Sequence, residues 1–496
     1  MIAAETTSWI QKRIPAEQRT KYMGNAADFI DDRAIKQALL SNASPDPGRV
    51  RDIIAKSIAI QTLTPDETAE LLNVKDAALV REMEDAALYI KKKVYDNRIV
   101  TFAPLYMSTK CVNNCSYCGL RRDNTVMKRG VLTQDEVRME TAVLAGKIGH
   151  KRIIAVYGEH PDSGIEYIAE TMKTIYGVRM KTEHGFGSIR RVNVNAAPMT
   201  VEELRVLHEA GLGTYQVFQE TYHHGTYRKV HPANTVKGDY QWRLYSMHRA
   251  MEAGIDDVGI GALFGLYDWK FEVMGLLCHA IELEQKFGIG PHTISFPRLE
   301  PAESTPLASN SPYMVGDADL RRAVVVLRLA VPYTGMILTA RENAAMRNSL
   351  VSLGITQTDA SSKIGLGAYS DPRPEQRPDR QQFILGDTRS LDELIGYLAE
   401  NGSITSFCTA GYRCGRTGKC IMDLLRTGAE GKFCKLNAVI TYREWLDDFA
   451  SDATKAAGEK VIQNEIEEIR VKNPKVFEMF MKNYEKTRAG ERDLYF

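Results

Sequence analysis

Three cysteines lie close together in the chain and could hold a metal cluster. Cys111, Cys115 and Cys118 have the spacing C-x-x-x-C-x-x-C. Thiolate sulfurs bind iron–sulfur clusters, usually with one cysteine for each iron. Three ligands on a four-iron cube leave one iron open for a small molecule, much as a catalytic zinc site keeps one position free. The spacing predicts such a 4Fe–4S cluster; the alternative is half of a zinc site whose other ligands lie elsewhere.

A second cysteine group lies far along the chain and suggests a separate metal or redox site. It contains Cys408, Cys414, Cys420 and Cys434, and a lone Cys278 lies between the two groups. Eight cysteines in a long chain without a recognisable signal peptide do not indicate a disulfide framework. We expect Cys278 to be a small core residue, because free cysteine is readily buried.

The composition excludes some classes of function. Lys plus Arg (64) nearly balances Asp plus Glu (63), so nothing directs the chain as a whole to nucleic acid or to an anionic membrane. The most apolar region, residues 323–339, is interrupted by Arg328 and Pro332, which argues against a membrane span. Residues 1–20 are polar and mixed in charge, unlike a secretory signal. A cytoplasmic location is therefore expected.

The elements that must position the first cysteines alternate between short apolar runs and helical stretches. This alternation predicts parallel strands joined by right-handed crossovers, and eight such units match an α/β fold of the (β/α)8 TIM-barrel type. The expected strands are 99–105, 152–157, 191–195, 214–218, 257–263, 292–296, 336–339 and, more weakly, 354–357. The expected helices include 136–148, 201–210, 240–253, 273–287 and 319–329.

Three regions follow from these patterns. We expect a helical N-terminal extension at residues 1–98, with Thr64 as the cap of one helix, a barrel at 99–370 and a mainly helical C-terminal region at 371–496. Residues 370–378 contain three prolines and are interpreted as a linker or a surface excursion. Polar residues directly follow several expected strands, and they would meet at the C-terminal face, where barrel active sites are built. They are Gly158–Glu159–His160, Asn193–Asn195, Gln219–Glu220–Thr221 and Arg341–Glu342. The alternative is that these strand ends are simply solvated.

Longer stretches around these residues resemble the radical S-adenosylmethionine (radical SAM) superfamily, and within it the tyrosine lyases of the HydG and ThiH type. The likeness covers residues 95 to about 450. The stretches that carry it are CVNNCSYCGLRR (111–122), GHKRIIAVYGEHP (149–161), IRRVNVNAAPM (189–199), GTYQVFQETYH (213–223), AGIDDVGIGALFGLYDW (253–269), GPHTISFPRLEPA (290–302) and YTGMILTARE (333–342).

The resemblance implies a cofactor and a reaction. The open iron would bind S-adenosylmethionine, which one electron would cleave to methionine and a 5′-deoxyadenosyl radical. Gly158 and Glu159 match the family position that receives the methionyl amine, and Glu220 is similarly placed for other polar groups of the cofactor. The radical would take hydrogen from L-tyrosine, whose Cα–Cβ bond would break to give p-cresol and dehydroglycine. Arg298 or Arg341 could bind the tyrosine carboxylate, or either could be a structural ion pair.

The resemblance also implies partners and a second cluster. The partners would be a reductant, such as ferredoxin or flavodoxin, and other hydrogenase maturation proteins. HydG-like proteins carry a C-terminal C-x-x-C and a later cysteine, which hold a cluster where dehydroglycine becomes carbon monoxide and cyanide. Cys408 and Cys434 match the first and third ligands, but Gly411 stands where the second is expected. His292 matches a family histidine that can hold an extra iron of this cluster.

The second cysteine group leaves several hypotheses open. Cys414 or Cys420 could replace the missing ligand, four thiolates could bind structural zinc, or the second site could be lost. The chain would accordingly be a HydG-like lyase that supplies carbon monoxide and cyanide for the FeFe-hydrogenase cofactor. Alternatively it would be a ThiH-like 2-iminoacetate synthase that stops at dehydroglycine. A hypothesis of another class is a non-catalytic metal-cluster assembly or carrier protein, against which the intact cysteine motif and Glu159 argue.

Overall fold

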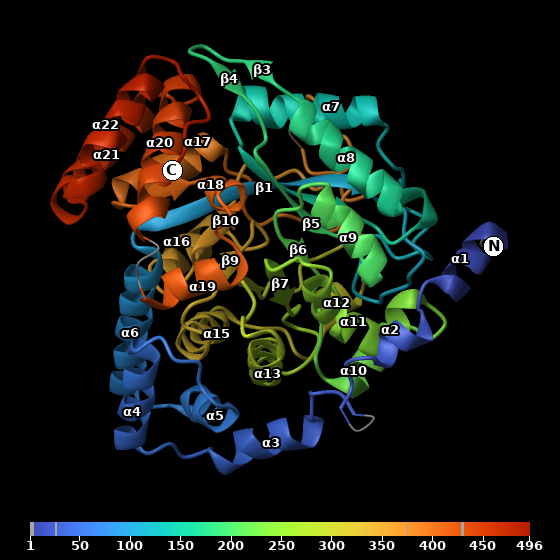
Figure 1. Cartoon of the computed structure of the whole chain (residues 1–496). Coiled ribbons are helices and arrows are strands. Elements are labelled where there is room, and N and C mark those ends of the chain that lie inside the picture. The colour runs from blue at the N-terminus through green and yellow to red at the C-terminus, as the bar shows by residue number, and fades with distance from the viewer. Residues whose placement is uncertain (1–3, 25–26, 374, 428–430) are drawn as a thin grey trace.

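Parallel strands form the centre of the molecule, and helices surround them (Figure 1). The computed structural model describes residues 4–24, 27–373, 375–427 and 431–496. Within these ranges, eight strands follow one another in the order β1, β2, β5, β6, β7, β8, β9, β10, and β10 pairs with β1 to close the barrel. Their bounds are Arg98–Ser108, Arg152–Tyr157, Arg191–Asn195, Tyr215–Gln216, Val258–Gly261, Thr293–Ser295, Gly335–Leu338 and Gln357–Asp359. The predicted (β/α)8 barrel is thereby confirmed.

The expected elements agree with the observed ones best where apolar runs are longest. The strands expected at 152–157 and 191–195 coincide with β2 and β5. The weak eighth strand lies a few residues later than expected, at β10, because its residues are mostly polar. The helix expected at 240–253 is broken at Tyr245 into α11 (Tyr240–Leu244) and α12 (Ser246–Glu252).

Strand residues alternate between the barrel interior and the surrounding helices. Phe102, Ile154 and Ile337 form a small buried cluster, and all three also line the cavity described below. The intervening residues Ile153 and Ala155 belong to the large core that the strands share with the helices. Because side chains alternate along each strand, residues just beyond the strand ends are carried around the rim of the barrel.

Helices cover the outside of the barrel between successive strands. They are α7 (Gln134–Val143), α8 (Ile165–Gly177), α9 (Val201–Glu209), α10 (His224–Val230), α11, α12, α13 (Trp269–Phe287), α14 (Leu307–Asn310), α15 (Asp317–Ala330) and α16 (Ala344–Val351). A π-helical turn, Leu144–Ile148, follows α7, and a small antiparallel pair, β3 (Met180–Lys181) and β4 (Phe186–Gly187), lies between α8 and β5. Among the described residues, the helices include none that is both long and apolar enough to cross a membrane.

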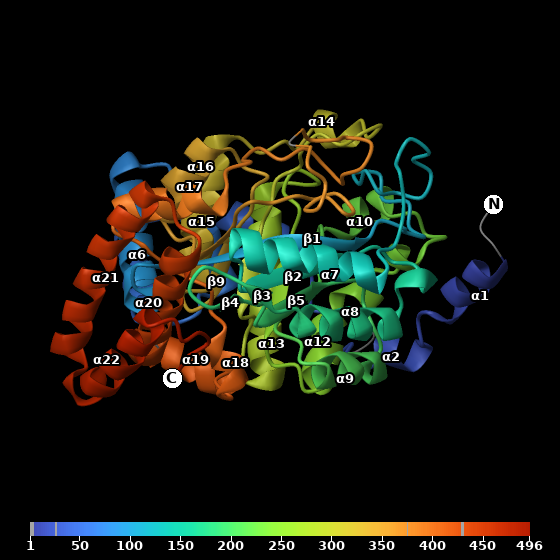
Figure 2. The same cartoon turned by 90° about the horizontal axis from the view of Figure 1, so that it is seen from above.

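The N-terminal extension wraps around part of the barrel. Its helices are α1 (Ala4–Lys12), α2 (Ala16–Thr20), α3 (Asp32–Ser41), α4 (Pro47–Ile58), α5 (Pro65–Asn73) and α6 (Ala77–Tyr95). Thr64 caps α5 as expected, since its hydroxyl accepts from the Glu67 amide and the Glu67 carboxylate accepts from the Thr64 amide. Helix α6 packs on α15 and helix α3 on α13, while α1 lies on the side opposite the C-terminal helices (Figures 1 and 2).

The C-terminal region is joined to the barrel by a strand of its own. It contains α17 (Leu391–Glu400), β11 (Ile404–Ser406), α18 (Ala410–Arg413), α19 (Gly418–Thr427), α20 (Gly431–Asp448), α21 (Asp452–Lys472) and α22 (Pro474–Arg488). Strand β11 pairs in parallel with the beginning of β1, over Arg98–Val100. The region also encloses a second apolar core, which includes Ile99 of β1.

A buried ionic cluster ties α20 to the barrel. The carboxylate of Glu444 is fully buried and lies 3.0 Å from the Lys151 Nζ atom and 2.8 Å from the Arg190 Nη2 atom. The backbone amide of Asp493 also donates to this carboxylate, at 2.8 Å. Removing one partner of such a cluster leaves the remaining buried charges uncompensated.

We therefore expect Glu444→Gln to lower the free energy of unfolding by about 3–5 kcal/mol, the usual cost of breaking a buried ion pair. Thermal denaturation followed by circular dichroism measures the effect. Glu467→Gln is the control, because Glu467 pairs with Arg470 on the exposed face of α21 and should leave the melting temperature nearly unchanged. Equal melting temperatures for both variants would contradict the prediction.

Candidate active site at the mouth of the barrel

A cavity of about 240 Å³ lies at the C-terminal ends of the barrel strands, and all three cysteines of the first motif line it. The loop that carries them follows β1. Backbone bonds fix the loop, because the Val112 amide donates to the Glu159 carbonyl at 2.8 Å and the Ser116 amide to the Val230 carbonyl at 3.0 Å. The cysteine loop and the end of β2, both of which the sequence places at this face of the barrel, are thus in contact.

The surroundings of the thiols suit a metal cluster. Cys115 is buried, while Cys111 and Cys118 are half-buried. Burial raises the pKa of Cys111 and raises that of Cys115 to about 12, so these sulfurs would lose their protons only to a bound metal. The Asn113 side-chain amide donates to the Cys111 sulfur at 3.7 Å. Hydrogen-bond donors aimed at sulfur are what a thiolate-bound cluster requires.

A single metal ion and a cubic cluster place different requirements on their thiol ligands. Across the described ranges, no group of three or more His, Cys, Asp or Glu side chains is arranged to hold one metal ion. A zinc site needs its ligands to converge on one point, whereas each thiolate of a cubic cluster binds a different iron. All three thiols line one cavity, where each could bind a separate iron of one cluster.

Gly158 and Glu159 lie directly beside this loop, as the sequence predicted. A Cβ atom on Gly158 would lie 2.1 Å from the Lys110 carbonyl oxygen, so only glycine allows β2 to end this close to the loop. The Glu159 carboxylate is 7% exposed, and its Oε2 atom accepts from the Asn113 amide at 2.5 Å. Its Oε1 atom is buried without a hydrogen-bond partner. A buried carboxylate oxygen at a cavity wall is suited to a cationic ligand.

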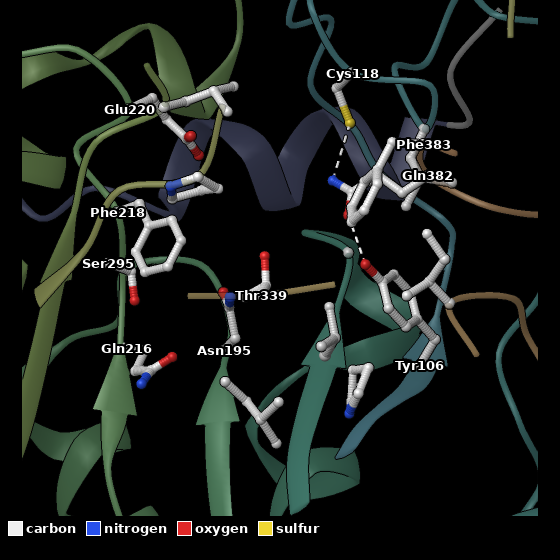
Figure 3. A pocket seen from close by; sticks show the side chains of 18 of the residues that line it. Tyr106, Cys118, Asn195, Gln216, Phe218, Glu220, Ser295, Thr339, Gln382 and Phe383 are labelled. Carbon is white, nitrogen blue, oxygen red and sulfur yellow. Dashed lines mark hydrogen bonds between the residues drawn. The ribbon is translucent and has the colours of Figure 1, made fainter. Parts of the chain in front are cut away.

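Glu220 is held rigidly at the opposite wall (Figure 3). Its backbone is in the left-handed region, with φ of 70°, which is a strained conformation for a residue with a side chain. The Oε1 atom lies 2.7 Å from Lys237 Nζ and 3.3 Å from Arg243 Nη2. Burial by itself would raise the pKa of Glu220, but these two cations outweigh it and hold the pKa below its ordinary value.

The fixed position of Glu220 depends on Glu272 of α13. The Glu272 carboxylate accepts from the Thr221 hydroxyl at 2.5 Å and from the Tyr222 amide at 2.8 Å. Both donors belong to the two residues that follow Glu220. The buried acid therefore stabilises the turn that carries the strained residue.

The two candidate arginines lie in different settings. Arg341 lines the cavity, and its guanidinium carbon lies 3.4 Å from the centre of the Phe383 ring. Arg298 is not among the lining residues; its Nε atom lies 2.8 Å from Glu342 Oε1 and its Nη1 atom 2.8 Å from Asp317 Oδ1. The hydrogen bond with Glu342 raises the pKa of Arg298 above its ordinary value. Arg341 is therefore the better placed of the two to bind a ligand in the cavity.

Several cavity residues were not predicted from the sequence. Gln216, Phe218, Ser295 and Thr339 project into the cavity from the inner faces of the strands or from the positions just beyond their ends (Figure 3). Asn195 lines the same cavity, at the strand end where the sequence did predict it. Asn113 lies within the cysteine motif, so its polar side chain was a usable signal. Further lining residues neither follow an expected strand directly nor belong to the cysteine motif: Lys237, Arg243, Glu300 and Gln382.

The second cysteine group lies at the other end of the barrel. Cys408 follows β11, which pairs with the beginning of β1, and His292 immediately precedes β8. The Cys408 sulfur accepts from Arg191 Nη1 at 3.3 Å, and the His292 Nδ1 atom lies 3.6 Å from Asp257 Oδ2. Arg191 and Asp257 are themselves 3.3 Å apart. Cys408 and His292 are thus connected through one buried ion pair.

The other cysteines of this group have different surroundings. Cys414 donates from its thiol to the Phe496 carbonyl at 3.5 Å, Cys420 is exposed and Cys434 lies half-buried in α20. Gly411 lies in α18, where a Cβ atom would meet only the Arg416 carbonyl oxygen, at 3.2 Å. Cys278 is half-buried on α13 and packs against the main core, in the place expected of a small core residue.

Comparisons with known proteins agree with this geometry. The family model "Radical SAM superfamily" matches residues 105–275, and the model "Biotin and Thiamin Synthesis associated domain" matches residues 295–404. The chain is 28% identical over 357 residues to 2-iminoacetate synthase of Escherichia coli (strain K12), which covers 72% of this chain and 89% of that protein.

Two solved structures of HydG resemble the whole molecule. One, a crystal structure of HydG described as a maturase of the FeFe-hydrogenase, is 46% identical, covers 95% of this chain and 100% of its own, and has a TM-score of 0.89. The other is the FeFe-hydrogenase maturase HydG from Carboxydothermus hydrogenoformans, which is 34% identical over 97% of this chain and 100% of its own, with a TM-score of 0.74. The chain therefore belongs to the radical SAM superfamily and, within it, to the HydG family.

Proposed function

We propose that this chain is a radical SAM tyrosine lyase that breaks the Cα–Cβ bond of L-tyrosine and forms p-cresol and dehydroglycine. The observation that carries the proposal is a single cavity lined by three cluster-type thiols, by Glu159 and by Arg341. Such a cavity combines a place for a cluster, an acceptor for an ammonium group and a cation for a carboxylate. The similarity to HydG and to 2-iminoacetate synthase supports tyrosine as the substrate.

The cluster residues and Glu159 would act on the cofactor. Cys111, Cys115 and Cys118 would hold a 4Fe–4S cluster, which when bound supplies the electron that cleaves S-adenosylmethionine and so generates a 5′-deoxyadenosyl radical. The unpartnered Glu159 Oε1 atom would accept a hydrogen bond from the methionyl ammonium group. Glu220, held by Lys237, would offer a fixed acceptor at the opposite wall. The walls of the cavity would shield the reacting groups from water.

Arg341 and Glu300 would act on the substrate. Arg341 is stacked on Phe383, and a planar guanidinium fixed in this way binds a carboxylate in a defined orientation. Glu300 lines the same cavity, and burial, with a smaller contribution from the negative charge of Glu342, raises its pKa to about 7. Glu300 could therefore hold or release a proton near neutral pH beside the bound amino acid.

The second cysteine group separates two versions of this function. The thiol that HydG-like proteins place at the second position is absent, because Gly411 has no ligating side chain. This substitution favours a reaction that ends at dehydroglycine, as in 2-iminoacetate synthase. Formation of carbon monoxide and cyanide would require Cys414 or Cys420 to complete the second cluster.

One anaerobic assay tests the proposed function. The chain is reconstituted with iron and sulfide and supplied with S-adenosylmethionine, reductant and L-tyrosine. We expect 5′-deoxyadenosine, p-cresol and dehydroglycine, with dehydroglycine trapped as glyoxylate, and no carbon monoxide. Carbon monoxide together with p-cresol would assign the longer reaction. Deoxyadenosine without p-cresol would exclude tyrosine as the substrate, and bound iron without either product would indicate a cluster carrier.

The two arginines provide a test of carboxylate binding. We expect Arg341→Lys to raise the KM for tyrosine about tenfold or more, because a charge-assisted bond contributes about 1.5–3 kcal/mol and each 1.4 kcal/mol of lost binding is a factor of ten. Arg298→Lys is the matched control; it preserves the charge opposite Glu342 and should change KM little. A larger effect of Arg298→Lys would reverse the assignment.

Glu300 should make substrate binding depend on pH. Below pH 7 its carboxyl group is protonated and leaves Arg341 to the substrate, while above pH 7 the ionised group competes for Arg341. The KM for tyrosine should therefore rise as the pH increases through about 7. Glu300→Gln should remove this rise, and Glu303→Gln on the same loop should retain it. Identical pH profiles for the wild type and Glu300→Gln would contradict the role.

A further inference from the structure

Gln382 reaches one of the three cluster cysteines from outside the barrel sequence. Its Nε2 atom lies 3.4 Å from the Cys118 sulfur, and its Oε1 atom accepts from the Tyr106 hydroxyl at 2.7 Å (Figure 3). Tyr106 belongs to β1, and Cys118 ends the motif that follows β1. A residue some 260 positions later in the chain therefore links the barrel wall to the cysteine loop.

The chemistry of the three groups fixes the direction of this link. A cluster-bound thiolate has no proton and can only accept, so the amide nitrogen of Gln382 must face Cys118. The amide oxygen then faces Tyr106, whose hydroxyl must donate. Tyr106 is 4% exposed, and burial raises the pKa of its phenol above the ordinary value, so the phenol keeps its proton. Tyr106 thus donates to Gln382, and Gln382 donates to the Cys118 sulfur.

The segment around Gln382, residues 381–385, is fixed against the cysteine loop; we call it the Gln382 segment. The Ile384 amide donates to the Pro301 carbonyl at 2.9 Å. Phe383 and Leu385 share a buried cluster with Leu120 of the cysteine loop. A Cβ atom on Gly119 would lie 2.6 Å from the Gln382 carbonyl oxygen, so the side-chain-free Gly119 allows the two segments to approach this closely. Gln382 is therefore held in place by its backbone and its neighbours.

We propose that Gln382 is a positioning residue that raises the reduction potential of the cluster through its N–H···S hydrogen bond, and that Tyr106 orients it for this purpose. Reduction adds one negative charge to the cluster, and a donor on a ligating sulfur stabilises the more negative state. The Tyr106 hydroxyl polarises the amide and strengthens its donation. The proposal rests on the cluster of the proposed function but not on its substrate.

The test is an anaerobic redox titration of the reconstituted full chain, followed by electron paramagnetic resonance, without S-adenosylmethionine or tyrosine. At the midpoint potential of the wild type, we expect Gln382→Leu to lower the ratio of reduced to oxidised cluster about tenfold, which corresponds to about 59 mV for one electron. Tyr106→Phe, which keeps the ring, should shift the potential in the same direction by less. With 15N-labelled glutamine, a nitrogen coupling to the reduced cluster should be present in the wild type and absent in Gln382→Leu.

Gln216→Leu is the matched control. Gln216 lines the same cavity on the opposite wall and, among the residues that the structure describes, is not hydrogen-bonded to a cysteine, so the same chemical change there should leave the potential as in the wild type (Figure 3). An equal shift in Gln216→Leu would assign the effect to cavity polarity and overturn the proposal. So would an unchanged potential in Gln382→Leu.

If Gln382→Leu binds no iron, an unchanged potential in Tyr106→Phe overturns the proposal and a lowered one supports it. A wild type without iron would instead refute the proposed function.

Discussion

The placement of three thiols in one cavity, one of them buried and two half-buried, is the constraint on which the rest of the mouth depends. A thiol in this position keeps its proton, as the raised pKa of Cys115 indicates, and a buried thiolate without a metal would be costly. The groups around the cysteines would stabilise the thiolate form. Asn113 and Gln382 offer donors to sulfur, and Gly119 and Gly158 allow two other segments to approach the loop. A bound cluster would satisfy the Cys111 and Cys115 sulfurs, whose pKa is raised by burial.

The two ends of the barrel interior differ in the contacts that their charged groups make. At the mouth, Glu220 contacts Lys237 and Arg243, and the buried Glu159 Oε1 atom has no hydrogen-bond partner within the described residues. At the other end, Arg191 is 2% exposed and already engages both Asp257 and Cys408. Cys408 has a positive φ of 47°, so its backbone is strained where its thiol meets Arg191. The mouth thus offers a cavity with an unsatisfied acceptor, whereas at the other end Arg191 already contacts both Asp257 and Cys408.

The sequence predicted those parts of the fold and the site that depend on local patterns. The β-branched runs of β2 and β5 give their strands, and Thr64 with Glu67 gives a helix start, because each signal lies within a few residues. The cysteine loop, Glu159 and Glu220 follow from motif and strand end together. Lys237, Arg243 and Gln382 could not be found in this way, because segments distant in sequence bring them to the cavity and neither a motif nor a strand end marks them.

The C-terminal region shows the same limit for the fold. Residues 370–378, expected as a linker or a surface excursion, are followed within a few residues by the Gln382 segment. That segment packs on the cysteine loop instead of leading away from the barrel. Strand β11 is only three residues long, within a region that otherwise reads as helical. Such a short strand forms because β1 offers it a partner, and that partner lies some three hundred residues earlier.

Strand β1 is the first barrel strand to be synthesised, yet because of this pairing it is among the last whose backbone groups are all hydrogen-bonded. Its neighbours β10 and β11 come from residues 357–359 and 404–406, so the ribosome must release more than three hundred residues before its backbone groups are all paired. Contacts of such sequence separation fold slowly. Until then the edge of β1 that does not pair with β2 is unprotected and open to pairing with other chains. A product that ends before residue 404 lacks β11, and the beginning of β1 is then left without that partner.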